Sequence, residues 1–167
     1  MSDTEPFKRA SAAARRLISH RPRSKSEIRG RLRRTFPPAV VERVVAYLAD
    51  HNLVDDTEFA LLWRNSRASS SPRSAALIRR ELVAKGVSRD IADETVGDLD
   101  DHVSAYDAGL KFARRLHQAD FLTFRRRLWG HLGRRGFGES VARRTVAQLW
   151  DERPQTDRES PYEAKEQ

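Results

Sequence analysis

The chain has 167 residues, of which 38% are hydrophobic and 34% are charged, so it can build only a thin apolar core. Its 32 lysines and arginines exceed its 24 acidic residues, and the formal net charge of +8 favours a polyanion or an acidic protein surface as the partner. It contains no cysteine, which excludes disulfides and thiolate metal sites, and no apolar run approaches the roughly 20 residues of a membrane span.

Apolar residues recur at steps of three and four along nearly the whole chain, which is the period of an amphipathic helix. Phe121, Phe124, Leu128 and Leu132, for example, fall on one helical face. No stretch of alternating apolar and polar residues is long enough for a strand. The sequence therefore predicts an all-α protein with helices over residues 6–20, 25–35, 38–51, 56–69, 72–85, 89–99, 103–118, 121–135 and 139–152.

Polar and small residues mark the expected helix ends. A serine or an aspartate followed three residues later by glutamate is typical of a capping box, and proline favours the first helical position. Glycine or asparagine supplies a left-handed residue just after a helix. The expected starts are Ser24 with Glu27, Asp55 with Glu58, Ser71 before Pro72, and Ser88; the expected turn residues are Asn52, Gly86 and Gly136.

An internal repeat is the most informative feature of the sequence. Phe36, Val87 and Phe137 lie 51 and 50 residues apart, and an apolar residue follows each of them at +4, +9 and +12. Such a period predicts tandem units that bury their apolar faces against one another. We expect three stacked three-helix repeats, over 6–52, 55–101 and 102–152, that form an elongated curved body, followed by a disordered tail over 153–167.

Catalytic chemistry requires a convergent set of groups, and the sequence offers none. It has no nucleophile elbow, phosphate-binding loop or dinucleotide glycine pattern, and its five histidines are not spaced as a metal pair. Asp100, Asp101 and His102 are adjacent, but they fall at a helix junction, where acids cap the following helix. We therefore expect no enzyme, no metal or other cofactor, and no small-molecule substrate.

Basic residues gather on the second helix of each expected repeat. If the repeats stack in register, these helices align into one basic stripe that binds DNA phosphates without reading the sequence. The alternative is a set of ion pairs with Glu27, Glu81 and neighbouring acids, but the third of these helices has almost no acids. The predicted stripe comprises Arg29, Arg31, Arg33, Arg34, Arg79, Arg80, Lys85, Arg125, Arg126, Arg127, Arg134 and Arg135.

Two other interpretations of these helices concern the bases of DNA. A helix-turn-helix repressor would read base edges, but one candidate recognition helix carries Asp90, Asp93 and Glu94, which repel phosphate. The tryptophans could stack on bases. Their helical spacing beside leucine and phenylalanine favours packing instead.

The sequence resembles the bacterial RecX family in four segments. Residues 21–32 are similar to the family's RPRS-x-x-E-L-R-x-x-L opening, and residues 53–67 resemble its L-I-D-D-x-x-F-A-x-x-W/F segment. Residues 79–87 match R-x-E-L-x-x-K-G-I, and residues 134–137 match R-R-G-F. The departures are Asn52, where glycine is usual, and Ser74, near an expected glycine; asparagine still tolerates the turn.

The resemblance implies three tandem three-helix repeats, in agreement with the period. It also implies that the protein binds the RecA recombinase, chiefly as its filament on single-stranded DNA, and modulates its ATPase and strand-exchange activity, usually as an inhibitor. The basic stripe is then the candidate surface for recombinase and DNA. We expect a monomer. We also expect a cytoplasmic protein, because the N-terminus lacks the pattern of a signal peptide. A non-specific architectural DNA-binding protein and a helix-turn-helix repressor stay open as alternatives.

Overall fold

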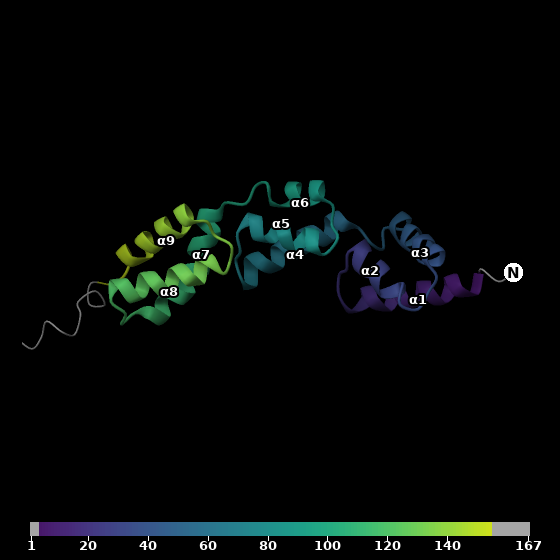
Figure 1. The fold of residues 1–167 in the computed structure, drawn as a ribbon, viewed down its shortest axis with the longest axis horizontal. Helices are drawn as coiled ribbons and strands as arrows, with labels where there is room; N and C mark the ends of the chain where they lie inside the picture. Colours follow the sequence, from purple (N-terminus) through teal and green to yellow (C-terminus); the bar gives the residue numbers. More distant parts are fainter. Residues whose placement is uncertain (1–3, 155–167) are drawn as a thin grey trace, which may run out of the picture. The chain divides into compact units, whose positions relative to one another are not determined.

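The computed structural model describes residues 4–154, and it confirms the predicted all-α class, with no strand in that range (Figure 1). No helix in the described part is long and apolar enough to cross a membrane. The helices are α1 (Thr4–His20), α2 (Lys25–Leu32), α3 (Pro38–Asp50), α4 (Asp56–Ser70), α5 (Ala75–Ala84), α6 (Arg89–Val96), α7 (Asp101–Ala113), the 3₁₀-helix η1 (Arg114–Leu116), α8 (Phe121–Gly133) and α9 (Glu139–Asp151).

The described residues form two compact units. The first contains the residues up to Ser66 together with Arg79–Gly97, and the second contains Arg67–Ile78 together with the residues from Asp98 onward. The second expected repeat thus contributes to both units. The division into repeats at 6–52, 55–101 and 102–152 stays a prediction.

Each unit has its own apolar core. In the first, α1, α2 and α3 bury a cluster centred on Ile28, Val41 and Leu48, all fully enclosed. In the second, α7, α8 and α9 pack side by side (Figure 1) around Phe124 and Leu128. Burying a large apolar side chain stabilises a fold by about 1.5–3 kcal/mol, so each large member of these clusters contributes on that order.

Most expected helix-end signals are present. Ser24 and Glu27 form the full capping box of α2, and Ser88 caps α6 through the amide of Ile91. Asp55 accepts from the amide of Thr57 at 2.7 Å, which begins α4. The predicted turn residues all have positive φ, namely Asn52 (53°), Gly86 (80°) and Gly136 (84°).

The prediction of a helix start at Ser71 and Pro72 was wrong. Helix α4 continues to Ser70, and α5 begins only at Ala75. Its capping residue is Ser74, whose buried hydroxyl accepts from the amide of Leu77 at 3.1 Å. Proline does not require a helix to start at its own position, and here the tertiary contacts of Ser74 set the boundary.

Of the predicted tail over 153–167, the structure describes only residues 153 and 154. Residues 155–167 lie outside the described residues. Arg153, which we expected to begin the tail, is instead buried in the second unit, with 9% of its surface exposed. The packed part of the chain therefore extends at least one residue beyond the expected boundary at 152.

Within the first unit, the start of α2 packs against the turn that follows α5. The Ser24 hydroxyl donates to the backbone carbonyl of Lys85 at 2.6 Å, and the Lys25 amide donates to the carboxylate of Asp56 at 2.8 Å. A Cβ added at Gly86 would overlap the side chain of Ser26. Glycine is therefore required both by its left-handed conformation and by this close approach.

The second unit contains the same arrangement between α5 and the turn after α8. The Ser74 amide donates to the carbonyl of Arg135 at 3.0 Å, and the Ala75 amide donates to the carboxylate of Asp101 at 2.8 Å. A Cβ on Gly136 would lie 2.5 Å from the hydroxyl of Ser74. We call this recurring contact between a helix start and a glycine turn the repeat junction.

Candidate nucleic-acid interface

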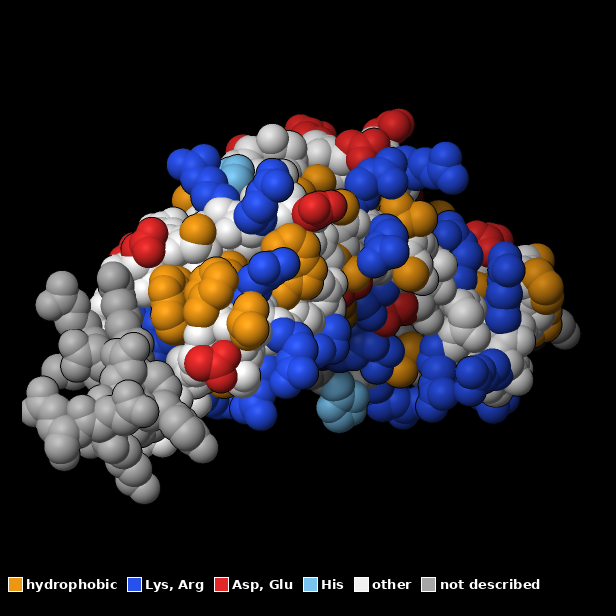
Figure 2. Space-filling view, turned by 60° about the vertical axis from the view of Figure 1, so that its left-hand side comes forward, with side chains coloured by type: hydrophobic (Ala, Val, Ile, Leu, Met, Phe, Trp, Pro, Cys, Tyr) orange, Lys and Arg blue, Asp and Glu red, His pale blue; other side chains and the backbone are white. Residues whose placement is uncertain are grey.

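The predicted basic residues lie on α2, α5 and α8 or just beyond the C-terminal ends of these helices, which correspond to the second helix of each expected repeat. Their surroundings differ from helix to helix. Figure 2 shows many Lys and Arg side chains at the surface, with hydrophobic and acidic side chains among them. The ion pairs among the described residues show which basic side chains are neutralised within the fold. The basic side chains without such a pair are available to a partner.

On α2, two of the four arginines are neutralised by α3. Arg29 and Arg33 each donate to Glu42 at 2.8 Å. Both hydrogen bonds hold the pKa of Glu42 below its usual value. Arg31 and Arg34 are exposed and form no ion pair with another described residue. Two of the four arginines at α2 are therefore in ion pairs, as the alternative interpretation expected. Their partner is Glu42 and not the expected Glu27.

On α5, Arg79 forms an ion pair with Asp93 of α6, and this pairing lowers the pKa of Asp93. Asp93 is one of the acids that argued against a recognition helix, and its ion pair with Arg79 gives it a structural role. Arg80 is exposed and has no ion-pair partner among residues 4–154.

The ammonium group of Lys85 lies 3.6 Å from Glu27 and 4.1 Å from the ring centre of Trp63. Glu27 also accepts from Arg21 at 2.8 Å. Burial raises the pKa of Glu27, but the hydrogen bonds from Arg21 and Ser24 and the charge of Lys85 bring it below its usual value. Lys85 is therefore largely occupied by contacts within the first unit.

Helix α8 carries the most accessible basic group. Arg125, Arg126 and Arg127 are exposed, and none of them forms an ion pair or a hydrogen bond with another described residue. Arg125 and Arg126 line a shallow depression of about 400 Å³ with Leu122, which is 71% exposed, and Trp129. Cations beside an exposed apolar surface are suited to a single strand, whose phosphates and bases need both.

The tryptophans fit the packing interpretation, with one qualification. Trp63 stacks on Phe59 and donates to Glu81 at 2.7 Å. Trp150 packs on Phe124, with ring centres 5.2 Å apart. Trp129 packs against the core of the second unit and also lines the α8 depression, so it retains a surface for a partner.

Arg134 and Arg135 follow α8. Arg134 is exposed, whereas Arg135 is partly buried and donates through one terminal nitrogen to Nδ1 of His131 at 3.3 Å. Burial, followed by the charge of Arg134, lowers the pKa of Arg135. Sequence reasoning did not anticipate this pairing with a histidine one helical turn earlier, although the spacing of four residues permits it.

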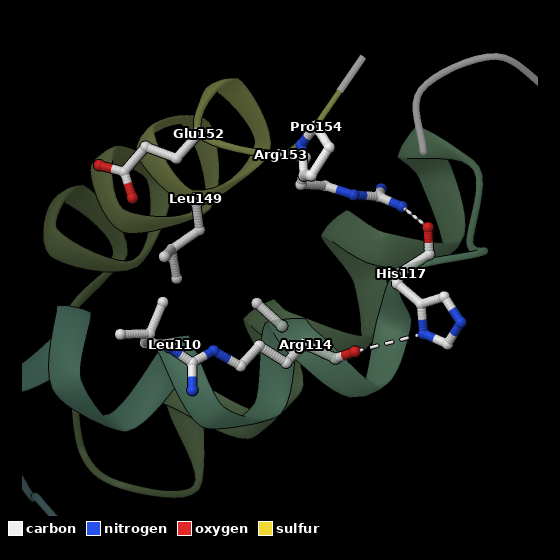
Figure 3. Close-up of a pocket in the computed structure, with 8 residues that line it drawn as sticks. Leu110, Arg114, His117, Leu149, Glu152, Arg153 and Pro154 are labelled. Carbon is white, nitrogen blue, oxygen red and sulfur yellow. Dashed lines mark hydrogen bonds between the residues drawn. The ribbon is translucent and has the colours of Figure 1, made fainter. Parts of the chain in front are cut away.

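A second depression, of about 360 Å³, lies beside the C-terminal end of α9 (Figure 3). Leu110 and Leu149 supply apolar lining. Arg153 donates to the carbonyls of Ala119 at 3.0 Å and Leu116 at 3.2 Å, and also to that of His117. Arg153 thus supplies side-chain donors to the carbonyls at and just after the end of η1, a role that its place in a polar C-terminal stretch did not indicate.

The acidic cluster at the start of α7 has structural partners. Asp100 caps the helix through the amides of His102 at 2.7 Å and Val103 at 3.4 Å, which fits the capping interpretation. Asp101 accepts from Ala75 in the repeat junction. Within residues 4–154, no three His, Asp or Glu side chains are grouped so that they could hold a metal ion.

Comparisons with known proteins agree in one family. Two family models match, described as the first and second three-helix domains of RecX, over residues 10–48 and 55–96. Two crystal structures of RecX share the fold. The one from Lactobacillus salivarius has a TM-score of 0.74 and 18% identity, and covers 87% of this chain and 97% of that chain. The other has a TM-score of 0.73 and 21% identity, and covers 89% of this chain and 75% of that chain.

Two RecX sequences are more similar to this chain, over nearly its whole length, than the two crystal structures are. The regulatory protein RecX of Mycobacterium tuberculosis is 34% identical over 161 residues, which cover 91% of this chain and 92% of the relative. The regulatory protein RecX of Chlorobium phaeobacteroides is also 34% identical, over 90% of this chain and 99% of the relative. Matches of this extent and identity establish kinship. The chain belongs to the RecX family of regulatory proteins.

Proposed function

We propose that this protein binds the RecA recombinase, chiefly as its filament on single-stranded DNA, and inhibits the filament's ATPase and strand-exchange activity. The observation that carries the proposal is membership of the RecX family over about nine-tenths of the chain. The role would be that of a regulator and not of an enzyme.

The surface of α8 supports this proposal. Arg125, Arg126 and Arg127 lack partners in the described part of the chain, so their charges are available to phosphates or to an acidic protein surface. Binding through several such groups releases counterions from DNA and becomes weaker as salt rises. The pairs on α2 and α5 leave fewer free charges there.

Inhibition follows if the protein binds one state of the filament more tightly than another. A regulator shifts an equilibrium only by its difference in affinity for the two states. Arginines on more than one helix would contact successive protomers or phosphates, and such contacts add avidity without requiring any single one to be strong.

The test is the single-stranded-DNA-dependent ATPase of the cognate recombinase, measured with rising amounts of this protein at physiological salt. We expect the ATPase to fall at amounts well below one copy per recombinase protomer. An unchanged ATPase across the whole titration would contradict the proposal.

A non-specific DNA-binding architectural protein is the second candidate, favoured by the free arginines on α8. Titrations with bare single-stranded and duplex DNA separate the two functions. Tight binding to any bare DNA, with no effect on the recombinase, is expected of the architectural protein. A filament regulator is expected to bind the recombinase filament more tightly than bare DNA and to change the ATPase.

A further inference from the structure

The second unit contains a polar cavity of about 470 Å³ that shares no lining residue with the α8 depression and adjoins the pocket in Figure 3, with which it shares Leu110 and Arg114. Its wall is formed by the segment 68–72, by α7 and η1, and by the C-terminal part of α8. The volume lies within the usual range of ligand sites and exceeds what a single oxyanion needs.

The charges in this cavity are strongly unbalanced. Lys111, Arg114, Arg115 and Arg135 line it, against the single acid Asp107. None of these four cations forms an ion pair with another described residue. Like charges held this close repel one another, and an anion placed between them would replace that repulsion with attraction.

One of the cations is held in place by the fold. His131 is buried, stacks on Phe112 with ring centres 4.1 Å apart, and donates through Nε2 to the carbonyl of Ala108 at 3.0 Å. Its Nδ1 therefore accepts from Arg135 at 3.3 Å. The other terminal nitrogen of Arg135 makes no hydrogen bond to a described residue.

The wall opposite supplies a further donor. Ser71 is among the residues that line the cavity, and its hydroxyl has no hydrogen-bond partner among the described residues. Arg73, two residues further along the chain, lies close enough to Arg135 and Arg67 that their charges, after the larger effect of burial, lower its pKa. The positive potential therefore extends across the cavity from α8 to the segment before α5.

We propose that this cavity binds a phosphate group of a nucleic-acid strand, with Arg115 and Arg135 contacting its oxygens and Lys111 and Arg114 meeting the adjoining backbone. The choice of a strand rests on the proposed function. A guanidinium offers a planar fork of donors that matches two phosphate oxygens, and the volume leaves room for the sugar. Because no described acid neutralises these cations, the strand binds here directly, without the recombinase.

The test compares two double variants that each remove two positive charges. Arg114→Gln with Arg115→Gln alters the cavity, and both side chains are exposed, so folding is expected to be preserved. Arg143→Gln with Arg144→Gln is the control, because these exposed arginines on α9 have no described partner and do not line the cavity. Binding to labelled oligothymidine is measured by fluorescence anisotropy over a range of salt concentrations, without recombinase. Thermal unfolding checks both variants.

We expect the cavity variant to bind about tenfold more weakly, and its salt slope to fall by about 0.7 for each phosphate that it no longer neutralises, while the control changes affinity by less than about threefold. Equal reductions in the two variants, or an unchanged affinity in the cavity variant, would overturn the proposal. Titrations with ATP and inorganic phosphate separate the sources. If their binding depends on Arg114 and Arg115 while oligothymidine binding does not, the assignment to a strand is wrong.

The recombinase ATPase is measured with the same variants. A wild-type protein that leaves the ATPase unchanged contradicts the proposed function, whatever its affinity for oligothymidine. A cavity variant that binds oligothymidine like the wild type contradicts the cavity assignment, even if the wild type inhibits the ATPase. The two failures are therefore distinguishable.

Discussion

The hydroxyl of Ser24 donates to the backbone carbonyl of Lys85 across 2.6 Å, although the two residues are 61 positions apart. The same oxygen accepts from the amide of Glu27 at 3.1 Å and so caps α2. One buried hydroxyl therefore both starts α2 and ties it to the turn that follows α5.

Replacing Ser24 with alanine removes both bonds. We expect the free energy of unfolding to fall by about 2–4 kcal/mol, since removing a cap costs about 1 and an orphaned buried group adds about 1–3. Ser88→Ala is the matched control, because Ser88 is exposed and caps only its own helix. Urea unfolding followed by circular dichroism measures both variants. Equal reductions would show that the bond to Lys85 adds nothing.

Alanine at Gly86 or Gly136 should destabilise the protein by about 1–3 kcal/mol, because each position combines a positive φ with a space too small for a Cβ. Gly30→Ala is the control. It lies inside α2 with open space around it and should stabilise the protein by about 0.5–1 kcal/mol. Chemical unfolding gives the sign of each change, and a stabilised Gly86→Ala variant would refute the junction argument.

Arg153→Met keeps much of the side-chain volume but removes the donors to three carbonyls at the end of η1. We expect the protein to be destabilised by about 1–3 kcal/mol, because the carbonyls of His117 and Ala119 lose the side-chain donor and that of Leu116 keeps only the amide of Ala119. Arg144→Met on the exposed face of α9 should change stability by less than about 0.5 kcal/mol. Differential scanning calorimetry compares the two melting temperatures, which are expected to differ by several degrees.

Stability should fall on mild acidification because of His131. Burial, followed by the charge of Arg135, lowers the pKa of His131 in the folded protein. The unfolded chain then binds the proton more readily, so this contribution is complete above the ordinary histidine pKa and is lost as pH falls towards the lowered value. His131→Gln should flatten the dependence of stability on pH between about 5 and 7. A wild-type stability that is flat in this range would contradict the prediction.

The two groups of arginines should differ in DNA binding. Arg125→Gln with Arg126→Gln removes free charges, and should weaken binding to single-stranded DNA and lower its salt slope by about 0.7 for each phosphate left without a cation. Arg29→Gln with Arg33→Gln removes the same charge from side chains already paired with Glu42, and should have a smaller effect. Anisotropy titrations with oligothymidine at several salt concentrations check this. Identical reductions in affinity would mean that net charge alone governs binding.

Local sequence signals predicted much of the fold. The capping box at Ser24 and the glycine turns depend on residues close together in the chain, so their patterns are readable. The start of α5 was misplaced because Ser74 is fixed partly by Arg135, which is 61 residues away.

The candidate surface was harder to predict for the same reason. The residues next to Arg29 and Arg33 in the sequence give no sign that both arginines pair with Glu42. Glu42 lies on another helix, 13 residues after Arg29 and 9 residues after Arg33. Arg153 showed only a polar context, and its acceptors lie 34 to 37 residues earlier. Helical period and composition indicate which residues are basic. Only the packing of separate helices decides which of them keep their charge for a partner.

The repeat junction has no counterpart on the N-terminal side. The residue that precedes Phe36 is Thr35, whose amide donates to the carbonyl of Leu32 at 3.0 Å and whose φ is not positive. A Cβ stands there, where Gly86 and Gly136 leave room for an incoming helix start. The contact that joins α2 to the turn after α5, and α5 to the turn after α8, is therefore not available at the turn after α2.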